Sequence, residues 1–426
     1  MSNISVSRGS TEVLDKVDGD LYVAEGATVR AKDSRKVEVS GAVQFEGDCA
    51  FACSLSTNSV KGRGGDMSVE GDLSVERTAR IRDGGLDIGG SFSAREVEVD
   101  KRASVGKDLS AEKFDVGGKA RVGGNTKARE IDVGGSFEAH GDVEAEKIEA
   151  GGSITIQGTT SGSSVSVGGT FEGKGKVSVD NIRVGGTAKV AGGEVRNRVS
   201  VGGTFESSNT LTFDVIDVGG RVTLASGCEG GRINVGGTLE ADGDLKFTDI
   251  DVGGSARIAG DAEGRTVDVG GKFAAERNLT LAGNLDVGGA AEIGEVLKAD
   301  SVSAGGSLRA RRIEAGQSVR VGGRIETREG VKAARVEIGR RGQIIGVVVA
   351  EEVLLREGAE ADDVHTSFLT MEEGSRARNV YAKRAYLERG CKIAGELKYT
   401  EELKKEEDIY FAREPEKTDR LPSPPI

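Results

Sequence analysis

The dipeptide Gly-Gly returns with a period of 17 along the middle of this 426-residue chain. The pairs begin at Gly117, Gly134, Gly151, Gly168, Gly185, Gly202, Gly219, Gly236, Gly253 and Gly270, and, after one step of 18, at Gly288, Gly305 and Gly322. A fixed period of this length indicates a solenoid, in which each repeat buries its apolar face only against its neighbours. The sequence therefore points to a long repeated surface rather than to a compact domain around one pocket.

Short strands precede the glycine pairs. Triplets such as Ile131-Asp132-Val133 and Ile182-Arg183-Val184 alternate apolar and polar residues, as half-buried strands do. We expect the glycines to adopt positive φ angles at a sharp corner, because glycine has no Cβ to clash there. An inward column follows the corner: Phe137, Ile154, Phe171, Ala188, Phe205, Val222, Leu239, Ala256 and Phe273.

A third strand closes each turn. In every second turn this strand carries two bulky inward residues: Val177/Val179, Leu211/Phe213, Leu245/Phe247 and Leu279/Leu281. In the turns between, we expect the same positions to hold Thr160/Gly162, Glu194/Arg196, Cys228/Gly230 and Ala262/Gly264. Large and small residues thus alternate between turns, as close packing of a narrow interior requires. Three strands in each short repeat predict an all-β fold, a single-stranded right-handed parallel β-helix of triangular cross-section.

The repeat pattern divides the chain into five segments. They are an N-terminal tail at 1–12, irregular first turns at 13–70, the regular Gly-Gly β-helix at 71–333, turns with a period of 16 at 334–398, and a C-terminal segment at 399–426. In the last segment we expect a capping helix over residues 401–411, followed by a disordered tail that contains prolines.

The turns with a period of 16 resemble a known family. The run from Ile338 to Val364, with Gly374 to Val380 and Gly390 to Leu397, is similar to the Gly-x-apolar-x-Gly rungs of the bactofilins. Those are polymer-forming cytoskeletal proteins with a right-handed β-helix core and disordered tails. The resemblance is close over 334–398 and extends to 13–333 as a general rung pattern, although this chain is several times longer than a typical core.

Residues for catalysis or cofactor binding are not evident. The chain has two histidines, His140 and His365, too few for a three-histidine metal site. The diglycine corners are not followed by the helix start and Gly-Lys-Ser/Thr that a phosphate loop needs. The four cysteines, Cys49, Cys53, Cys228 and Cys391, are expected to be buried, reduced thiols. We therefore predict a protein that is not an enzyme and has no catalytic, metal-binding or cofactor-binding residues.

Carboxylates form one column on the surface. It comprises Asp115, Asp132 and Glu149, an interruption by Ser166, Arg183 and Ser200, and then Asp217, Asn234, Asp251, Asp268 and Asp286. Such a column could attract a cation or a cationic partner. A solvated strand face, charged for solubility, is the simpler interpretation.

The stretch from Arg309 to Arg341 is rich in basic residues. A shift of 17 predicts that Arg309 meets Glu326, Arg312 meets Glu329 and Arg320 meets Glu337. The remaining arginines would form like-charged pairs, Arg311 with Arg328 and Arg324 with Arg341, and are the candidate patch for an acidic partner. No aromatic residue is interleaved to stack on bases, so nucleic acid is not the expected partner.

These features favour a structural protein, cytoskeletal or scaffolding, that associates with itself through its ends without nucleotide. The candidate end surface comprises Tyr386, Leu387, Ile393, Leu397 and Tyr399. Other scaffold or envelope proteins are further candidate partners. A capped monomeric rod that binds partners along its sides is an alternative, and so is a surface β-helix that binds or cleaves polysaccharide.

The chain is also expected to be cytoplasmic. Its net charge is −12, its start lacks the apolar segment of a signal peptide, and no stretch approaches 18 apolar residues. We do not expect it to insert into a membrane.

Overall fold

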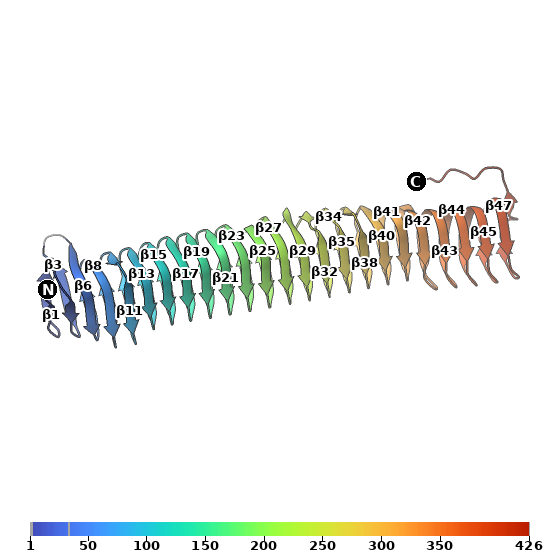
Figure 1. The fold of residues 1–426 in the computed structure, drawn as a ribbon. Coiled ribbons are helices and arrows are strands. Elements are labelled where there is room, and N and C mark those ends of the chain that lie inside the picture. Colours follow the sequence, from blue (N-terminus) through green and yellow to red (C-terminus); the bar gives the residue numbers. More distant parts are fainter. Residues whose placement is uncertain (1–2, 33–34, 426) are drawn as a thin grey trace. The chain divides into compact units, whose positions relative to one another are not determined.

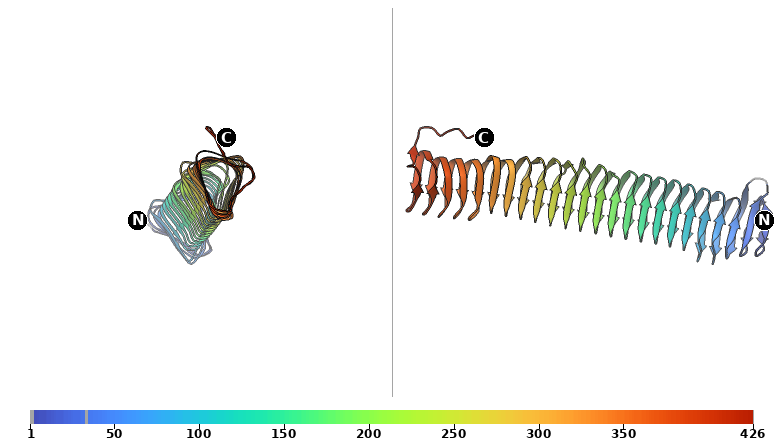
Figure 2. Two further views of the ribbon diagram at one scale, coloured as in Figure 1. Left: turned by 90° about the vertical axis from the view of Figure 1, so that its right-hand side faces the viewer. Right: turned by 180° about the vertical axis from the view of Figure 1, so that it is seen from behind.

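The protein is an all-β parallel solenoid with about 17 residues per turn (Figure 1). A computed structural model of the chain describes residues 3–32 and 35–425, which contain no helix. The chain divides into two compact units, Met1–Asp214 (unit 1) and Val215–Ile426 (unit 2). Within each unit, strands of one turn pair in parallel with the equivalent strands of the next, so that the turns form a stack (Figure 2).

A regular turn of unit 1 has three straight stretches. β16 (Lys119–Val122) is the first, and β17 (Thr126–Val133) supplies the other two. The pairing of β17 with β19 (Val143–Ala150) skips Arg129, which marks the corner between these two stretches. Paired residues are separated by one predicted repeat, as Ile131 and Ile148 are. The sequence therefore predicted both the period and the three strands per turn.

In unit 2 the three stretches are often separate strands. β33 (Ser255–Ile258), β34 (Ala262–Gly264) and β35 (Thr266–Val269) make one turn, which pairs with β36 (Lys272–Ala275), β37 (Leu279–Leu281) and β38 (Asn284–Val287). The single step of 18 is confirmed by the pairing of Val267 with Leu285. The period of 16 is confirmed between β44 (Glu360–Met371) and β45 (Arg376–Leu387), where Val364 pairs with Val380.

The interior consists of the predicted inward columns. Phe137, Ile154, Phe171, Ala188 and Phe205 are at most 1% exposed and stack on one another through successive turns. Large side chains lie against small ones. A Cβ built on Gly62 would stand 2.0 Å from the ring of Phe45, and one on Gly264 would stand 2.2 Å from the ring of Phe247. All four cysteines are buried, as predicted.

One predicted pair in the third strand is wrong. β23 (Val177–Val184) pairs with β25 (Gly193–Val201) so that Val177 meets Gly193 and Val179 meets Val195, and the inward residue is Val195 rather than Arg196. The register then shifts by one residue before Asn181. Gly192 and Gly193, with φ of 119° and 121°, allow this shortened turn.

The diglycine corners do not use positive φ, contrary to expectation. None of Gly134, Gly135, Gly151 and Gly168 belongs to the residues with positive φ. Glycine is required there for space, because a Cβ on Gly151 would stand 2.3 Å from the carbonyl oxygen of Gly134, and one on Gly168 would stand 2.2 Å from that of Gly151. The amide of each glycine also continues the ladder, as Gly135 N donates to the carbonyl of Gly118 at 2.8 Å.

Positive φ does occur at this corner, but toward the two ends of the chain. Gly9, Gly26, Gly47 and Gly64 adopt it in the first turns, and Gly358, Gly374 and Gly390 adopt it in the last turns. Arg341 occupies the same position with φ of 56°, where the diglycine pairs give way to the turns with a period of 16. This corner therefore contains a residue with positive φ in the first turns, a diglycine pair in the middle turns, and a residue with positive φ again in the last turns.

Both expected terminal segments contain strands of the solenoid. β1 (Ile4–Val6) and β2 (Thr11–Leu14) pair with β4 (Leu21–Val23) and β5 (Ala27–Ala31), so the described part of 1–12 is a first turn and not a tail. The helix expected over 401–411 is also wrong. β47 (Leu397–Lys405) and β48 (Tyr410–Phe411) add one more turn there. Residues 1–2 and 426 of these segments lie outside the described residues.

We predict that alanine at a diglycine corner destabilises the fold by crowding. Gly168→Ala should cost about 3 kcal/mol in the free energy of unfolding, because the new Cβ overlaps a backbone carbonyl that cannot move. Gly64→Ala is the matched control. Nothing lies within 4 Å of its Cβ, and only its φ of 73° is strained, for about 1 to 2 kcal/mol. Urea unfolding measures both, and a smaller loss for Gly168→Ala than for Gly64→Ala would contradict this explanation.

We also predict that Thr160→Val stabilises the protein. The Thr160 side chain is fully buried, and its hydroxyl has no hydrogen-bond partner. Removing an unpaired buried hydroxyl should raise the free energy of unfolding by about 1 kcal/mol. Thr57→Val should lower it by a similar amount, because the equally buried Thr57 hydroxyl donates to the Gly41 carbonyl at 2.9 Å. Thermal unfolding of the two variants should show opposite shifts.

Candidate functional site

The predicted end surface lies one turn inside the true end. Leu387, Ile393 and Leu397 are at most 1% exposed and belong to the interior columns. The last turn covers them, since Leu387 pairs with Lys405 of β47 and Ile393 of β46 (Lys392–Ile393) pairs with Phe411. The sequence identified these apolar positions but did not show that another turn follows.

The two tyrosines of that set also face the last turn. Tyr386 is 36% exposed and donates a hydrogen bond from its hydroxyl to Glu406 at 2.7 Å. Tyr399 pairs with Lys417 of β49 (Glu416–Lys417). The terminal surface is therefore formed by β47, β48 and β49.

The last turn repeats the corner of the turns before it. Glu372, Glu388 and Glu406 each accept a hydrogen bond from a backbone amide of the preceding corner, from Glu357, Glu373 and Arg389, at 3.0 to 3.1 Å. Asp408, with φ of 60°, stands where the earlier corners have Gly374 and Gly390. The spacing between Glu406 and Asp408 equals the spacing between Glu388 and Gly390, and this match is the feature of the sequence that could have indicated the last turn.

Both ends of the solenoid carry strand edges that are unpaired among the described residues. β1 pairs with β4 alone, and β48 pairs with β46 alone. Ile4 N donates to Asp20 O and Val6 O accepts from Ala24 N, so the alternating backbone groups of Ser5 point away from the stack. By the same alternation, Tyr410 and Ala412 donate to the turn before, and the amide of Phe411 points outward.

The candidate arginine patch is not assembled. Arg311 lies between two carboxylates, with Nε 2.7 Å from Glu295 and Nη1 2.8 Å from Glu329. Arg324 pairs with Gln343 rather than with Arg341.

The physical reason is a pair of changes in register. A bulge at Gly330, with φ of 106°, shifts Arg311 and Arg312 by one residue, and the corner at Arg340-Arg341 is two residues longer than a diglycine corner. The bulge also moves Arg312 onto Glu314, at 2.5 Å, instead of Glu329. The predicted pairs Arg309–Glu326, at 3.3 Å, and Arg320–Glu337, at 3.0 Å, are confirmed. Arg328 and Arg341 have no ion pair with the described residues.

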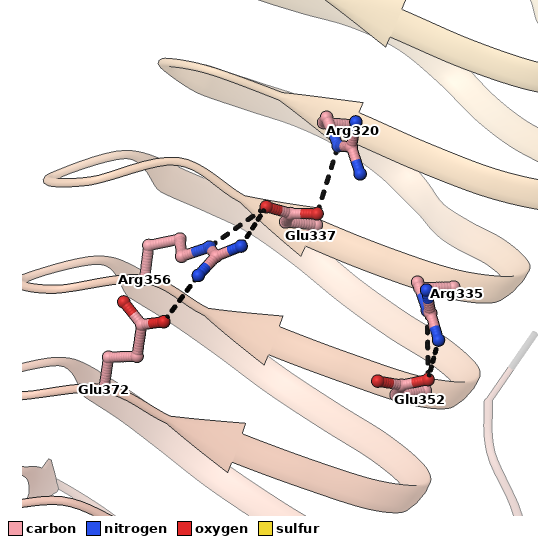
Figure 3. Close-up of polar contacts among 6 residues, drawn as sticks. All are labelled: Arg320, Arg335, Glu337, Glu352, Arg356 and Glu372. Atoms are coloured by element: carbon pink, nitrogen blue, oxygen red, sulfur yellow. Dashed lines mark hydrogen bonds and ion pairs between the residues drawn. The ribbon is translucent and has the colours of Figure 1, made fainter.

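Most of this stretch is neutralised by ladders of ion pairs that run along the solenoid (Figure 3). Arg320, Glu337, Arg356 and Glu372 form one ladder over four turns, with contacts of 3.0, 2.9 and 2.7 Å. Burial opposes ionisation of Glu337, but hydrogen bonds from Arg356 and Arg320 hold its pKa below its usual value. The basic stretch therefore links turns to one another and leaves little free positive charge.

The predicted acidic column exists in each unit. In unit 1, Asp115, Asp132 and Glu149 lie in register, and in unit 2 Asp251, Asp268 and Asp286 do. Burial raises the pKa of Asp132, and the carboxylates of Asp115 and Glu149 raise it further. Burial, Asp286 and Asp251 raise the pKa of Asp268 in the same way. These rows hold negative charge that the neighbouring cations do not fully compensate.

Both histidines contact neighbouring side chains. His140, in unit 1, is hydrogen-bonded to Glu138 at 2.8 Å, and His365, in unit 2, stacks on Tyr381 with ring centroids 4.6 Å apart. Among residues 3–32 and 35–425, no group of three or more histidine, cysteine, aspartate or glutamate side chains could hold a metal ion. The same residues include no helix with the length and apolar character needed to cross a membrane.

Comparison with known proteins adds no relative. No family model matches the chain, and neither a curated protein nor a solved structure does.

We predict that Asp268→Asn stabilises unit 2 at neutral pH. The folded pKa of Asp268 is raised above the ordinary aspartate value of 3.8, so its ionised form is disfavoured in the folded state at pH 7. That penalty is relieved as the pH falls through the raised pKa, and it is gone below 3.8. The gain in the free energy of unfolding should therefore be present at pH 7 and absent at pH values below 3.8.

Asp261→Ala is the control with the opposite sign. The pKa of Asp261 is lowered, chiefly because its carboxylate accepts the backbone amide of Asn278 at 3.0 Å. Its stabilisation is present above 3.8 and is lost as the pH falls through the lowered pKa. Asp261→Ala should therefore destabilise at pH 7. If Asp268→Asn also destabilised there, the interpretation of the acidic row would be wrong.

Proposed function

We propose that the protein is a non-enzymatic structural element, cytoskeletal or scaffolding, that assembles with further copies through its ends. The observation that supports this most is the pair of open strand edges, one at β1 to β3 (Lys16–Val17) and one at β47 to β49. An unpaired edge presents backbone donors and acceptors that another strand can extend.

The terminal turns are ordinary turns of the solenoid, which supports the same proposal. The corner of the last turn has a glutamate bonded to the preceding corner and a residue with positive φ, as the corners inside the stack do. A further turn from another copy would therefore contact the same kind of surface as a turn inside the stack. The contacts consist of backbone groups and stacked side chains, which require no nucleotide. The resemblance of residues 334–398 to the bactofilins agrees with this role.

The charge of the last edge favours a second candidate, the capped solenoid that binds partners along its sides. Glu401, Glu402, Lys404 and Lys405 crowd β47, and charged residues on an edge strand are a common means of preventing edge-to-edge pairing. Each edge also presents an exposed apolar side chain, since Val13 on β2 is 54% exposed and Tyr410 on β48 is 57% exposed.

Proline substitutions at the edges test the proposal. Ser5→Pro removes an outward amide and keeps the inward hydrogen bonds of Ile4 and Val6. Phe411→Pro removes the outward amide at the other end. In nucleotide-free buffer we expect filaments of the unaltered chain by negative-stain electron microscopy, shorter assemblies for Ser5→Pro, and single particles for the double variant.

Ser5→Ala is the matched control, because it keeps the amide and should leave assembly unchanged. Single particles of the unaltered chain at every concentration would contradict end-wise assembly and would favour the capped solenoid. Equal assembly of the double proline variant and the unaltered chain would show that the edges are not the contact.

A further inference from the structure

One face of unit 1 has its charges separated into blocks. On β8 (Ser54–Arg63), β11 (Thr78–Arg82), β13 (Phe92–Val99), β15 (Leu109–Val116), β17 and β19, the residues just before the glycine corner lie in one column through six consecutive turns. In order along the stack, this column contains Lys61, Arg80, Glu98, Asp115, Asp132 and Glu149. Positive charge is thus followed by negative charge on the same face.

The basic block comprises Lys61, Arg63, Arg80 and Arg82, on two adjacent turns. Arg80 is bonded to Glu98, whereas Lys61, Arg63 and Arg82 are exposed and have no ion pair with the described residues. A groove of about 400 Å³ lies between Lys61, Arg80 and Arg82. The block therefore has free cations around a hollow that could admit carboxylate side chains.

The acidic block comprises Asp115, Asp132 and Glu149. Lys113 lies 3.5 Å from Asp115, and Lys147 lies 2.7 Å from Glu149, but Asp132 in the middle keeps a raised pKa because of burial and its two acidic neighbours. On β13, β15, β17 and β19, two neighbouring columns of this face contain more carboxylates than lysines. The carboxylates are Glu96, Glu98, Asp115, Glu130, Asp132 and Glu149, and the lysines are Lys113 and Lys147.

The two blocks match in spacing as well as in sign. Hydrogen-bonded turns follow each other at about 4.8 Å, so cations and carboxylates recur at the same interval on every copy of the chain. If two copies face each other with opposite directions, a two-fold axis between Glu98 and Asp115 places Lys61 opposite Glu149 and Arg80 opposite Asp132, and it leaves Glu98 opposite Asp115 beside the axis. The symmetry makes each contact twice and closes the pair.

We propose that this face of unit 1 binds the same face of a second copy side by side, in an antiparallel two-fold pair held by the basic and acidic blocks. The column next to the acidic block consists of Gly117, Gly134 and Gly151, which leaves room for the long side chains of Arg63 and Arg82. The contact does not use the strand edges, so it is independent of end-wise assembly and can join assembled solenoids laterally.

Paired charge reversals in the full chain test this contact. One variant carries Lys61→Glu and Arg80→Glu, and the other carries Asp132→Lys and Glu149→Lys, so that the reversed residues face each other with opposite signs in the mixture. By analytical ultracentrifugation, we expect the unaltered chain to form pairs at about 50 mM salt and to lose them at about 500 mM. Each variant alone should associate at least about tenfold more weakly, and an equimolar mixture of the two should restore the pair.

The mixture separates loss of contact from loss of folding, since misfolded variants would not recover on mixing. Lys107→Glu with Lys119→Glu is the control: it makes the same change in net charge as the first variant, at exposed positions outside this face, and should leave pairing intact. End-wise association is the same in all samples, because none of these substitutions touches a terminal turn. Failure of the unaltered chain to pair at low salt, or failure of the mixture to recover, would overturn the proposal.

Discussion

The close approach of successive turns at the glycine corner is the constraint on which the rest of the solenoid depends. Each glycine lies against the carbonyl of its equivalent one turn earlier, as Gly185 does against Gly168, where a Cβ would stand 2.2 Å from the oxygen. The backbone ladder continues through this corner without interruption. Because the turns cannot separate there, every other residue must lie directly beside its equivalent in the next turn.

That constraint explains the interior. A ring such as Phe45 or Phe247 needs more depth than one turn provides, and the glycine at the equivalent position of the next turn supplies the missing space. Isolated polar groups are costly in the same setting, because Thr160 has only apolar neighbours above and below in its column and its hydroxyl stays unpaired. The packing and hydrogen bonding of an interior side chain thus depend on the residues at the equivalent position in the turns before and after it.

The same stacking determines how much the sequence could predict. The period, the inward columns and the acidic rows follow directly from a shift of 17, so they were predicted correctly apart from the pair Glu194/Arg196. The contacts of Arg311, Arg312 and Arg324 were not, because a bulge at Gly330 and two additional corner residues at Arg340-Arg341 change the shift locally. The last turn was missed because Glu401 to Asp408 has strong helix-forming composition, which pairing with β45 overrides. A single inserted residue is hard to recognise from a periodic pattern. The same holds for a segment whose strand pairing overrides its helical propensity.

Stacking also determines what the outside can recognise. A charge on one turn lies beside the charge of the next, so alternating signs give internal ladders such as Arg320–Glu337–Arg356–Glu372, and these neutralise themselves. A run of one sign cannot do so. Lys61 with Arg80, and Asp115 with Asp132 and Glu149, are such runs, and their spacing is imposed by the backbone rather than by the side chains. A surface with the same backbone spacing and the opposite sign complements such runs, as Asp132 and Glu149 complement Arg80 and Lys61 in the antiparallel pair proposed above.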